Sequence, residues 1–195
     1  VGSEALGSAS GATTEGNNVA IGANSMKSAN LNGAEFNVAV GNNTLDAITT
    51  ADNVTAIGYN AGTALTEGSR LTAVGFEAGK ALTTAIDCTL IGETAGTAIT
   101  TGRSNTALGK FALAGFDAET HNVGIGVGAI GGAVNGGEFN VAVGNFTLDA
   151  LTTADNNVAI GDNAGSALTT GGENVIMGSF AVSTGVLTGA QNVAI

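Results

Sequence analysis

The chain contains neither proline nor tryptophan, and it has only one cysteine, Cys88, among 195 residues. The lack of proline excludes a collagen-like triple helix, and a lone cysteine excludes an intrachain disulfide. Charged residues are also scarce, at 11% against roughly 25% in an ordinary globular domain. The composition therefore argues against a conventional solvated globule.

The charge that is present has one dominant sign. Sixteen Asp and Glu against five Lys and Arg give a net charge of −11, which is the wrong sign for binding nucleic acid. No apolar run approaches the roughly 18 residues of a membrane helix, and a hydrophobic content of 44% argues against disorder. We expect a protein that neither binds nucleic acid nor is embedded in a membrane.

Glycine is abundant, with 32 residues, and much of it belongs to a repeat. A phrase of the form Asn-Val-Ala-Ile-Gly recurs along the chain, and we call its last residue the repeat glycine. The repeat glycines are Gly22, Gly41, Gly58, Gly75, Gly92, Gly109, Gly126, Gly144, Gly161 and Gly178, and Gly2 fits the start of the series. Most intervals are 17 residues long, which is the period of a solenoid repeat.

A longer duplication overlies the short repeat. Residues 35–42 recur unchanged at 138–145, six units further along the chain. No linker or shift in composition divides the chain, so we expect one repetitive domain over residues 1–195. Because both ends fall within the repeat, we interpret the chain as a piece of a longer fibrous protein.

The unit 58–75 shows what one repeat encodes. Three glycines in 17 residues disfavour a helix, whereas residues 63–66 and 71–74 have the composition of short strands bounded by turns. In the second stretch a β-branched residue, a small residue and a bulky aliphatic residue follow one another in almost every unit. Side chains alternate across a strand, so the β-branched and bulky columns share one face and the alanine column lies on the other. We expect both faces to be buried, with the alanine face turned toward neighbouring chains.

Asparagine occupies the position before the β-branched column in most units. Identical asparagines stacked in register can hydrogen-bond from one coil to the next. The members of this column are Asn18, Asn37, Asn105, Asn122, Asn140, Asn157, Asn174 and Asn192.

These features predict an all-β fold, a parallel β-solenoid (β-roll) of about eleven 17-residue coils with two short strands per coil. Coils would be about 4.8 Å apart. The charge-free alanine face favours several chains packed or intertwined along their length as a homotrimer. A monomeric solenoid with one plain face is the alternative.

The segments 157–161 (Asn-Val-Ala-Ile-Gly) and 161–171 resemble the head repeats of trimeric autotransporter adhesins and, equally, repeats of phage tail fibres. The resemblance covers nearly the whole chain. It implies a homotrimer of left-handed parallel β-rolls that attaches to a surface. The corresponding location is extracellular, on a virion tail fibre or a bacterial cell, and the partner is a host-surface or extracellular receptor, for which a glycan is one candidate.

The residues that could support chemistry are few. His121, the only histidine, falls in a turn position without a nucleophile beside it, and we expect it to be solvated. Cys88 replaces an asparagine in its column, which favours a packed thiol over a nucleophile. The glycine-rich stretch 124–128 is explained by the repeat, and no Asp-x-Asp-x-Asp-Gly loop is present. We predict no catalytic residue, no metal site and no cofactor.

Two surface columns allow binding functions. Aromatic residues follow the repeat glycines at Tyr59, Phe76, Phe111, Phe146 and Phe180, where they could stack on sugars or seal a contact between chains. Threonines recur at Thr49, Thr66, Thr83, Thr100, Thr152 and Thr169, and such an array could order water in an ice-binding solenoid.

The favoured function is therefore a non-enzymatic structural and attachment module, a rigid trimeric shaft or head segment. Ice binding is the alternative. An acyltransferase-type β-helix enzyme fits poorly, because it would need a histidine-bearing site between chains.

Overall fold

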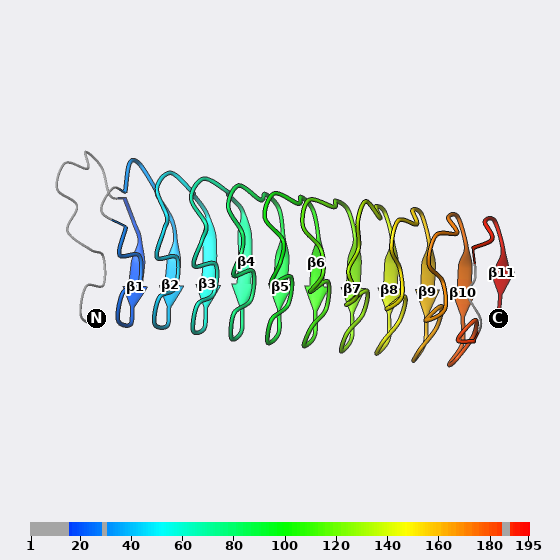
Figure 1. Cartoon of the computed structure of the whole chain (residues 1–195). Helices are drawn as coiled ribbons and strands as arrows, with labels where there is room; N and C mark the ends of the chain where they lie inside the picture. Colours follow the sequence, from blue (N-terminus) through cyan, green and yellow to red (C-terminus); the bar gives the residue numbers. More distant parts are fainter. Residues whose placement is uncertain (1–15, 29–30, 185–187) are drawn as a thin grey trace.

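The chain forms a straight stack of coils, each of which contributes one short strand (Figure 1). The computed structural model describes residues 16–28, 31–184 and 188–195. The strands pair in sequence order into one parallel 11-stranded sheet. They are β1 (Val19–Ile21), β2 (Val38–Val40), β3 (Val54–Ile57), β4 (Leu71–Val74), β5 (Thr89–Ile91), β6 (Thr106–Leu108), β7 (Val123–Ile125), β8 (Val141–Val143), β9 (Val158–Ile160), β10 (Val175–Met177) and β11 (Val193–Ala194). The parallel β-solenoid is confirmed, while the expected first unit from Gly2 lies outside the described residues.

The pairing register places the sequence columns directly above one another. Ala39 of β2 pairs with Ala56 of β3, and Ala56 pairs with Ala73 of β4. The register also holds across the unit of 18 residues, where Val123 pairs with Val141. Inserted residues are therefore absorbed in the turns, and the strands stay aligned.

The second predicted strand does not form, so the solenoid has one sheet instead of two. Residues 63–66 belong to a series of turns, although their backbone still bonds from coil to coil, as in Thr49 N–H to Thr66 O at 3.0 Å. The chain enters this segment through turns instead of an extended conformation. The second and fourth residues after a repeat glycine have left-handed φ values, as in Glu77 (54°) and Leu113 (50°), and the N–H of Leu65 bonds back to the carbonyl of Gly62 at 3.0 Å.

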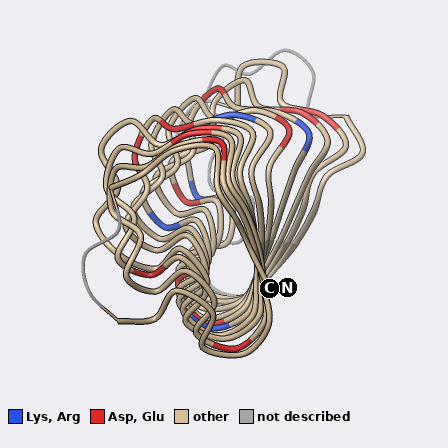
Figure 2. Ribbon diagram, turned by 90° about the vertical axis from the view of Figure 1, so that its right-hand side faces the viewer, with Lys and Arg blue, Asp and Glu red and all other residues tan. Residues whose placement is uncertain are grey.

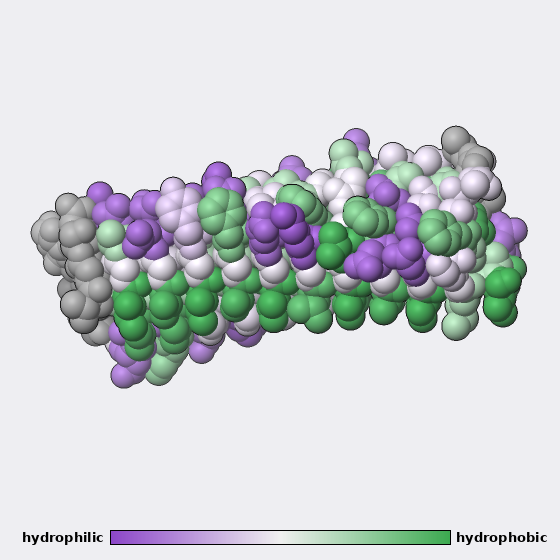
Figure 3. Space-filling model, turned by 90° about the horizontal axis from the view of Figure 1, so that it is seen from below, coloured by the Kyte–Doolittle hydropathy of each residue, from purple (hydrophilic) through white to green (hydrophobic). Residues whose placement is uncertain are grey.

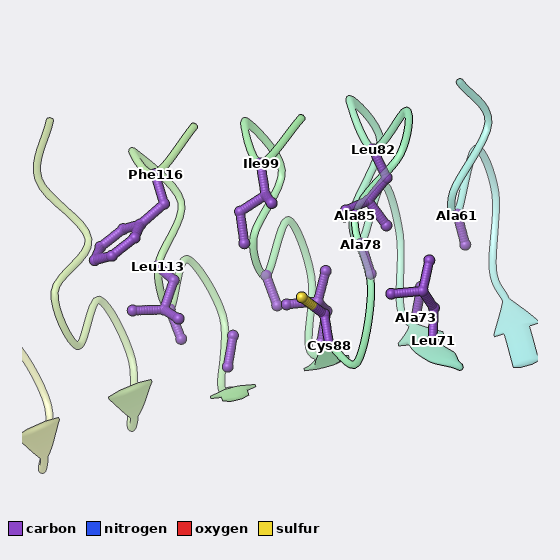
Figure 4. Packing of buried hydrophobic residues seen from close by; sticks show 14 of the residues in the cluster. Ala61, Leu71, Ala73, Ala78, Leu82, Ala85, Cys88, Ile99, Leu113 and Phe116 are labelled. Carbon is purple, nitrogen blue, oxygen red and sulfur yellow. The ribbon is translucent and has the colours of Figure 1, made fainter. Parts of the chain in front are cut away.

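The alanine column faces the interior of the coil, which corrects the expectation that it faces other chains. Ala39 and Ala56 have no exposed surface, and the side chains of Leu82, Ile99 and Phe116 reach the same core from the opposite wall (Figure 4). Each coil is narrow, so a small residue under the strand leaves room for a large one across from it. The β-branched and bulky columns consequently point outward.

Exceptions in the alanine column are compensated by neighbouring residues. Leu90 replaces the alanine in β5, and a Cβ added to Gly96 or to Gly79 would lie 2.8 Å or 3.0 Å from a Leu90 methyl carbon. Conversely, Gly124 occupies this column in β7, where the side chain of Leu113 lies 3.0 Å from the position of an added Cβ. Large and small residues thus exchange places across the core at constant volume, as close packing requires.

The repeat glycines are required by both conformation and space. Gly92 has a φ of 139°, a region that only glycine adopts readily. A Cβ added there would lie 2.4 Å from the carbonyl oxygen of Gly109, the repeat glycine of the next coil. The repeat phrase ends in glycine because successive backbones approach this closely at the end of each strand.

The predicted asparagine stacking is confirmed. The Oδ1 of the buried Asn140 accepts the backbone N–H and the Nδ2 of Asn157, each at 3.0 Å, while Asn140 Nδ2 donates to the carbonyl of Ala154 at 2.8 Å. Val54, Leu71 and Cys88 take the asparagine position in three coils, and all three are buried. The ladder therefore satisfies buried backbone groups along the axis and is replaced locally by apolar packing.

Candidate binding surface

The residues considered for catalysis do not form a reactive group. Cys88 is buried, its Sγ lies 3.5 Å from the carbonyl oxygens of Ile86 and Gly102, and burial raises the pKa of its thiol. His121 is exposed, as predicted, and its ring stacks on Phe139 with centroids 4.8 Å apart. A buried thiol with a raised pKa is a poor nucleophile, and the two residues have separate surroundings.

The threonine column is used within the solenoid. The hydroxyl of Thr66 donates to the carbonyl of Thr83 at 3.2 Å, and the hydroxyl of Thr83 donates to Thr100 O at 3.1 Å. The same arrangement recurs at Thr49 and Thr152. These hydroxyls point along the stack, toward the next coil, and their hydrogens are already engaged.

Charged side chains lie on the turns, and the strands carry none. Figure 2, a view down the long axis of the rod, shows the Asp, Glu, Lys and Arg residues on the loops. Ion pairs connect adjacent coils, as between Arg70 and Asp87, where the guanidinium lowers the pKa of the carboxyl, and between Lys110 and Glu93 at 3.0 Å. These exposed pairs contribute little to stability. Because all of these charges lie on the turns, the outward face of the sheet carries none.

The outward face of the sheet is a continuous aliphatic stripe, which we call the sheet stripe. It consists of the bulky apolar residue before each repeat glycine, from Ile21 to Met177, and Figure 3 shows it as a green row along the rod. Ile21, Ile57, Leu108 and Ile160 are 47%, 39%, 45% and 40% exposed. A contiguous apolar surface of this length marks an interaction site. The sequence columns predicted an apolar face, but they placed it on the alanine side.

The aromatic residues form a second surface feature on the adjoining turns. Tyr59 and Phe76 follow consecutive repeat glycines and stack with centroids 5.5 Å apart. Lys110 Nζ lies 4.8 Å from the ring centroid of Phe111. The sequence did not single out Phe36 and Phe139, which are 54% and 50% exposed and precede their strands. Both lie five residues before a repeat glycine, and this shared position could have identified them as a pair in the sequence.

Comparisons with protein families, with curated proteins and with solved structures found no match to this chain. Within the described residues, no helix has the length and apolar character needed to cross a membrane. In the same part of the chain, no cluster of three or more His, Cys, Asp or Glu side chains is arranged to hold a metal ion.

Proposed function

We propose that this chain is a non-enzymatic structural and attachment module, a rigid segment of an extracellular trimeric fibre. The observation that carries the proposal is the sheet stripe. Exposed aliphatic surface along the full length of a rod is costly in water, and burying it against copies of the same rod removes that cost along the whole length.

Three chains suit the shape of the stripe. Each coil contributes one bulky apolar residue, such as Ile57, to the stripe, so the stripe is narrow. When three rods meet on one axis, each narrow stripe contacts two neighbours and is covered from both sides. The repeats' resemblance to adhesin heads and phage tail fibres supports the same number of chains and an attachment role on a virion or a bacterial surface.

The solenoid itself supports a mechanical role. Ten parallel strand pairings at about 4.8 Å give a rod of about 48 Å. Adjacent coils are joined by backbone bonds on the sheet and in the turns, and in most coils also by the asparagine ladder. Such a rod can hold a receptor-binding element, for which a glycan-binding one is an example, at a fixed distance.

Light scattering combined with size exclusion tests the assembly. The expected mass is three times the chain mass of 18.7 kDa. Ile57→Asp and Leu108→Asp, both in the sheet stripe, should dissociate the trimer, whereas Thr50→Asp, on an exposed turn, should not. A monomer at micromolar concentration would refute the trimer.

The attachment role has its own test. Antibodies against the chain should label the surface of intact virions or bacteria that carry it, and labelling confined to the cell interior would refute an extracellular role. Ice binding is less well supported because the threonine hydroxyls donate within the solenoid. A freezing hysteresis gap produced by the purified protein would favour it instead.

A further inference from the structure

A recess of about 260 Å³ interrupts the aromatic column in the second half of the rod. Phe111, Gly128 and Phe146 are each the second residue after a repeat glycine, so they follow one another in three consecutive coils. The two phenylalanines are therefore two coil spacings apart, about 9.6 Å along the axis. Gly128 has no side chain, and the ring of Phe146 leans over it, because a Cβ added to Gly128 would lie 2.9 Å from Phe146 Cδ1.

The floor of the recess is backbone that side chains cannot cover. A Cβ added to Gly131 would lie 3.0 Å from the carbonyl oxygens of Gly128 and Phe111, and one added to Gly132 would lie 2.3 Å from the carbonyl oxygen of Asp149. Three glycines in one coil thus leave the recess between the Phe111 and Phe146 side chains without any other side chain in its floor. The recess is built by the sequence of this coil.

Asp149, the remaining lining residue, carries an unsatisfied acceptor. Its Oδ1 is buried and has no hydrogen-bond partner, the only such side-chain oxygen or nitrogen found in the described part of the chain. A buried acceptor without a donor is destabilising. Burial raises the pKa of this carboxyl, and a hydrogen bond from its own backbone N–H opposes the effect only in part. No cationic side chain lines the recess. A ligand with an ammonium N–H or a hydroxyl would supply the missing donor, and its positive charge would compensate the carboxylate.

We infer that the recess between Phe111 and Phe146 binds a small organic cation, an alkylammonium head group, with Asp149 as its counter-ion. Aromatic faces attract ammonium groups, and a nearby carboxylate completes the arrangement. The chain already uses this chemistry beside the recess. Lys110 Nζ lies 4.8 Å from the Phe111 ring centroid and 3.0 Å from Glu93 Oε1, in the preceding coil. The net charge of −11 further favours a cation over an anion.

Choline and tetramethylammonium are suitable probes, and 3,3-dimethylbutan-1-ol is the uncharged counterpart of choline. Titration of the full chain, followed by NMR of the phenylalanine rings and by calorimetry, should show saturable binding of both cations. The alcohol should bind about tenfold more weakly, because it has the shape of choline without the charge. Binding should weaken as the pH falls and Asp149 becomes protonated.

Three variants locate the site. Gly128→Asn should abolish binding, because its side chain fills the recess and displaces the Phe146 ring, which lies 2.9 Å from the position of the added Cβ. The backbone accepts asparagine there, since Asn60 and Asn163 occupy the same position with φ values of 55° and 54° against 63° at Gly128. Asp149→Asn should weaken binding of choline by about tenfold without changing binding of the alcohol. Phe180→Asn, in the same column outside the recess, is the matched control and should bind as the unmodified chain does.

Several results would overturn the inference. Equal affinity for choline and the alcohol would show a merely apolar recess. Ring shifts with monosaccharides but not with choline would show a sugar site. Unchanged binding in a folded Gly128→Asn variant, with its circular dichroism intact, would place the cation elsewhere.

Discussion

Leu90 is a large residue where most coils have alanine, and it packs against glycines where other coils have leucine. This reciprocal packing can be tested by exchanging the large and small residues within one coil. Leu90 is fully buried and occupies the space left by Gly96 and Gly79. Leu90→Ala restores the residue found in most other coils but leaves a cavity, because the opposing glycines contribute no side chain. The expected loss of unfolding free energy is about 2–5 kcal/mol, the range for buried leucine truncations.

The compensating change is Gly96→Leu. Alone, it should destabilise the protein by about 1–3 kcal/mol, because its Cβ would lie 2.8 Å from Leu90 Cδ2 and 2.9 Å from Ile99 Cδ1. Combined with Leu90→Ala, the new leucine fills the cavity. The backbone tolerates leucine there, since Leu113 has a φ of 50° at the equivalent position against 56° at Gly96. A left-handed leucine still costs about 1 kcal/mol, so the double variant should remain slightly less stable than the unmodified chain.

Urea denaturation followed by circular dichroism, at one fixed protein concentration, measures the four stabilities. Fixed concentration is needed because the proposed self-association would add to the apparent stability. The double variant should be more stable than Leu90→Ala, with a coupling energy of about 2 kcal/mol. Gly62→Leu is the matched control, since it lies in the same column away from Leu90, and it should not rescue Leu90→Ala. Additive losses would refute reciprocal packing.

Three other changes have distinct expected outcomes. Gly92→Ala should lower the free energy of unfolding, measured with heat or urea, by about 3 kcal/mol or more. Alanine disfavours the positive φ of Gly92, and its Cβ would collide with the backbone of the next coil. Asn140→Ala should cost about 1–3 kcal/mol in the same assay, because it leaves the Asn157 N–H unpaired, and equal stability would contradict a structural ladder. Asp149 has a raised pKa, so its contribution to stability is complete at acidic pH and is lost as the pH rises through the folded-state value. Asp149→Asn should therefore unfold at a higher temperature than the unmodified chain at pH 7, with the difference vanishing near pH 3.

The sequence predicted the stacking direction and the register because these depend only on periodicity. Strand alternation placed the alanine column and the bulky column on opposite faces, but alternation does not say which face is inside. That choice depends on the width of the coil. Leu82 and Phe116, reaching across from the far wall, leave room for nothing larger than alanine beneath most strands.

The missing second strand has a similar explanation. Residues 63–66 have a strand-like composition, but the left-handed residues that precede them fold the chain into turns. Because non-glycine residues rarely adopt left-handed conformations, residues such as Glu77 and Leu113 did not indicate these turns in the sequence. An indirect signal was present. Gly62 and Gly96 share a column with Leu45 and Leu113, and glycine recurring in one column indicates a conformation that glycine accepts most easily.

The candidate recess escaped prediction because it is defined by an absent side chain. Gly128 was explained as part of a glycine-rich repeat, and its place between two phenylalanines becomes meaningful only when coils are stacked. The unpaired oxygen of Asp149 likewise depends on three-dimensional burial. Sequence columns can identify such places once the register is known, by searching for a glycine between two aromatic residues.

The solenoid separates residues that maintain the fold from residues free to vary. Interior positions are coupled to both adjacent coils, so Leu90 requires glycine at two neighbouring places. The second position after the repeat glycine, by contrast, accepts Glu77, Phe111 or Asn163 with φ values of 54°, 60° and 54°. A constant backbone with a variable outward side chain lets one coil acquire a binding recess while the sheet stripe beside it stays unchanged. The proposed ligand recess and the proposed assembly surface can therefore be altered independently, and substitutions at Gly128 should leave the mass measured by light scattering unchanged.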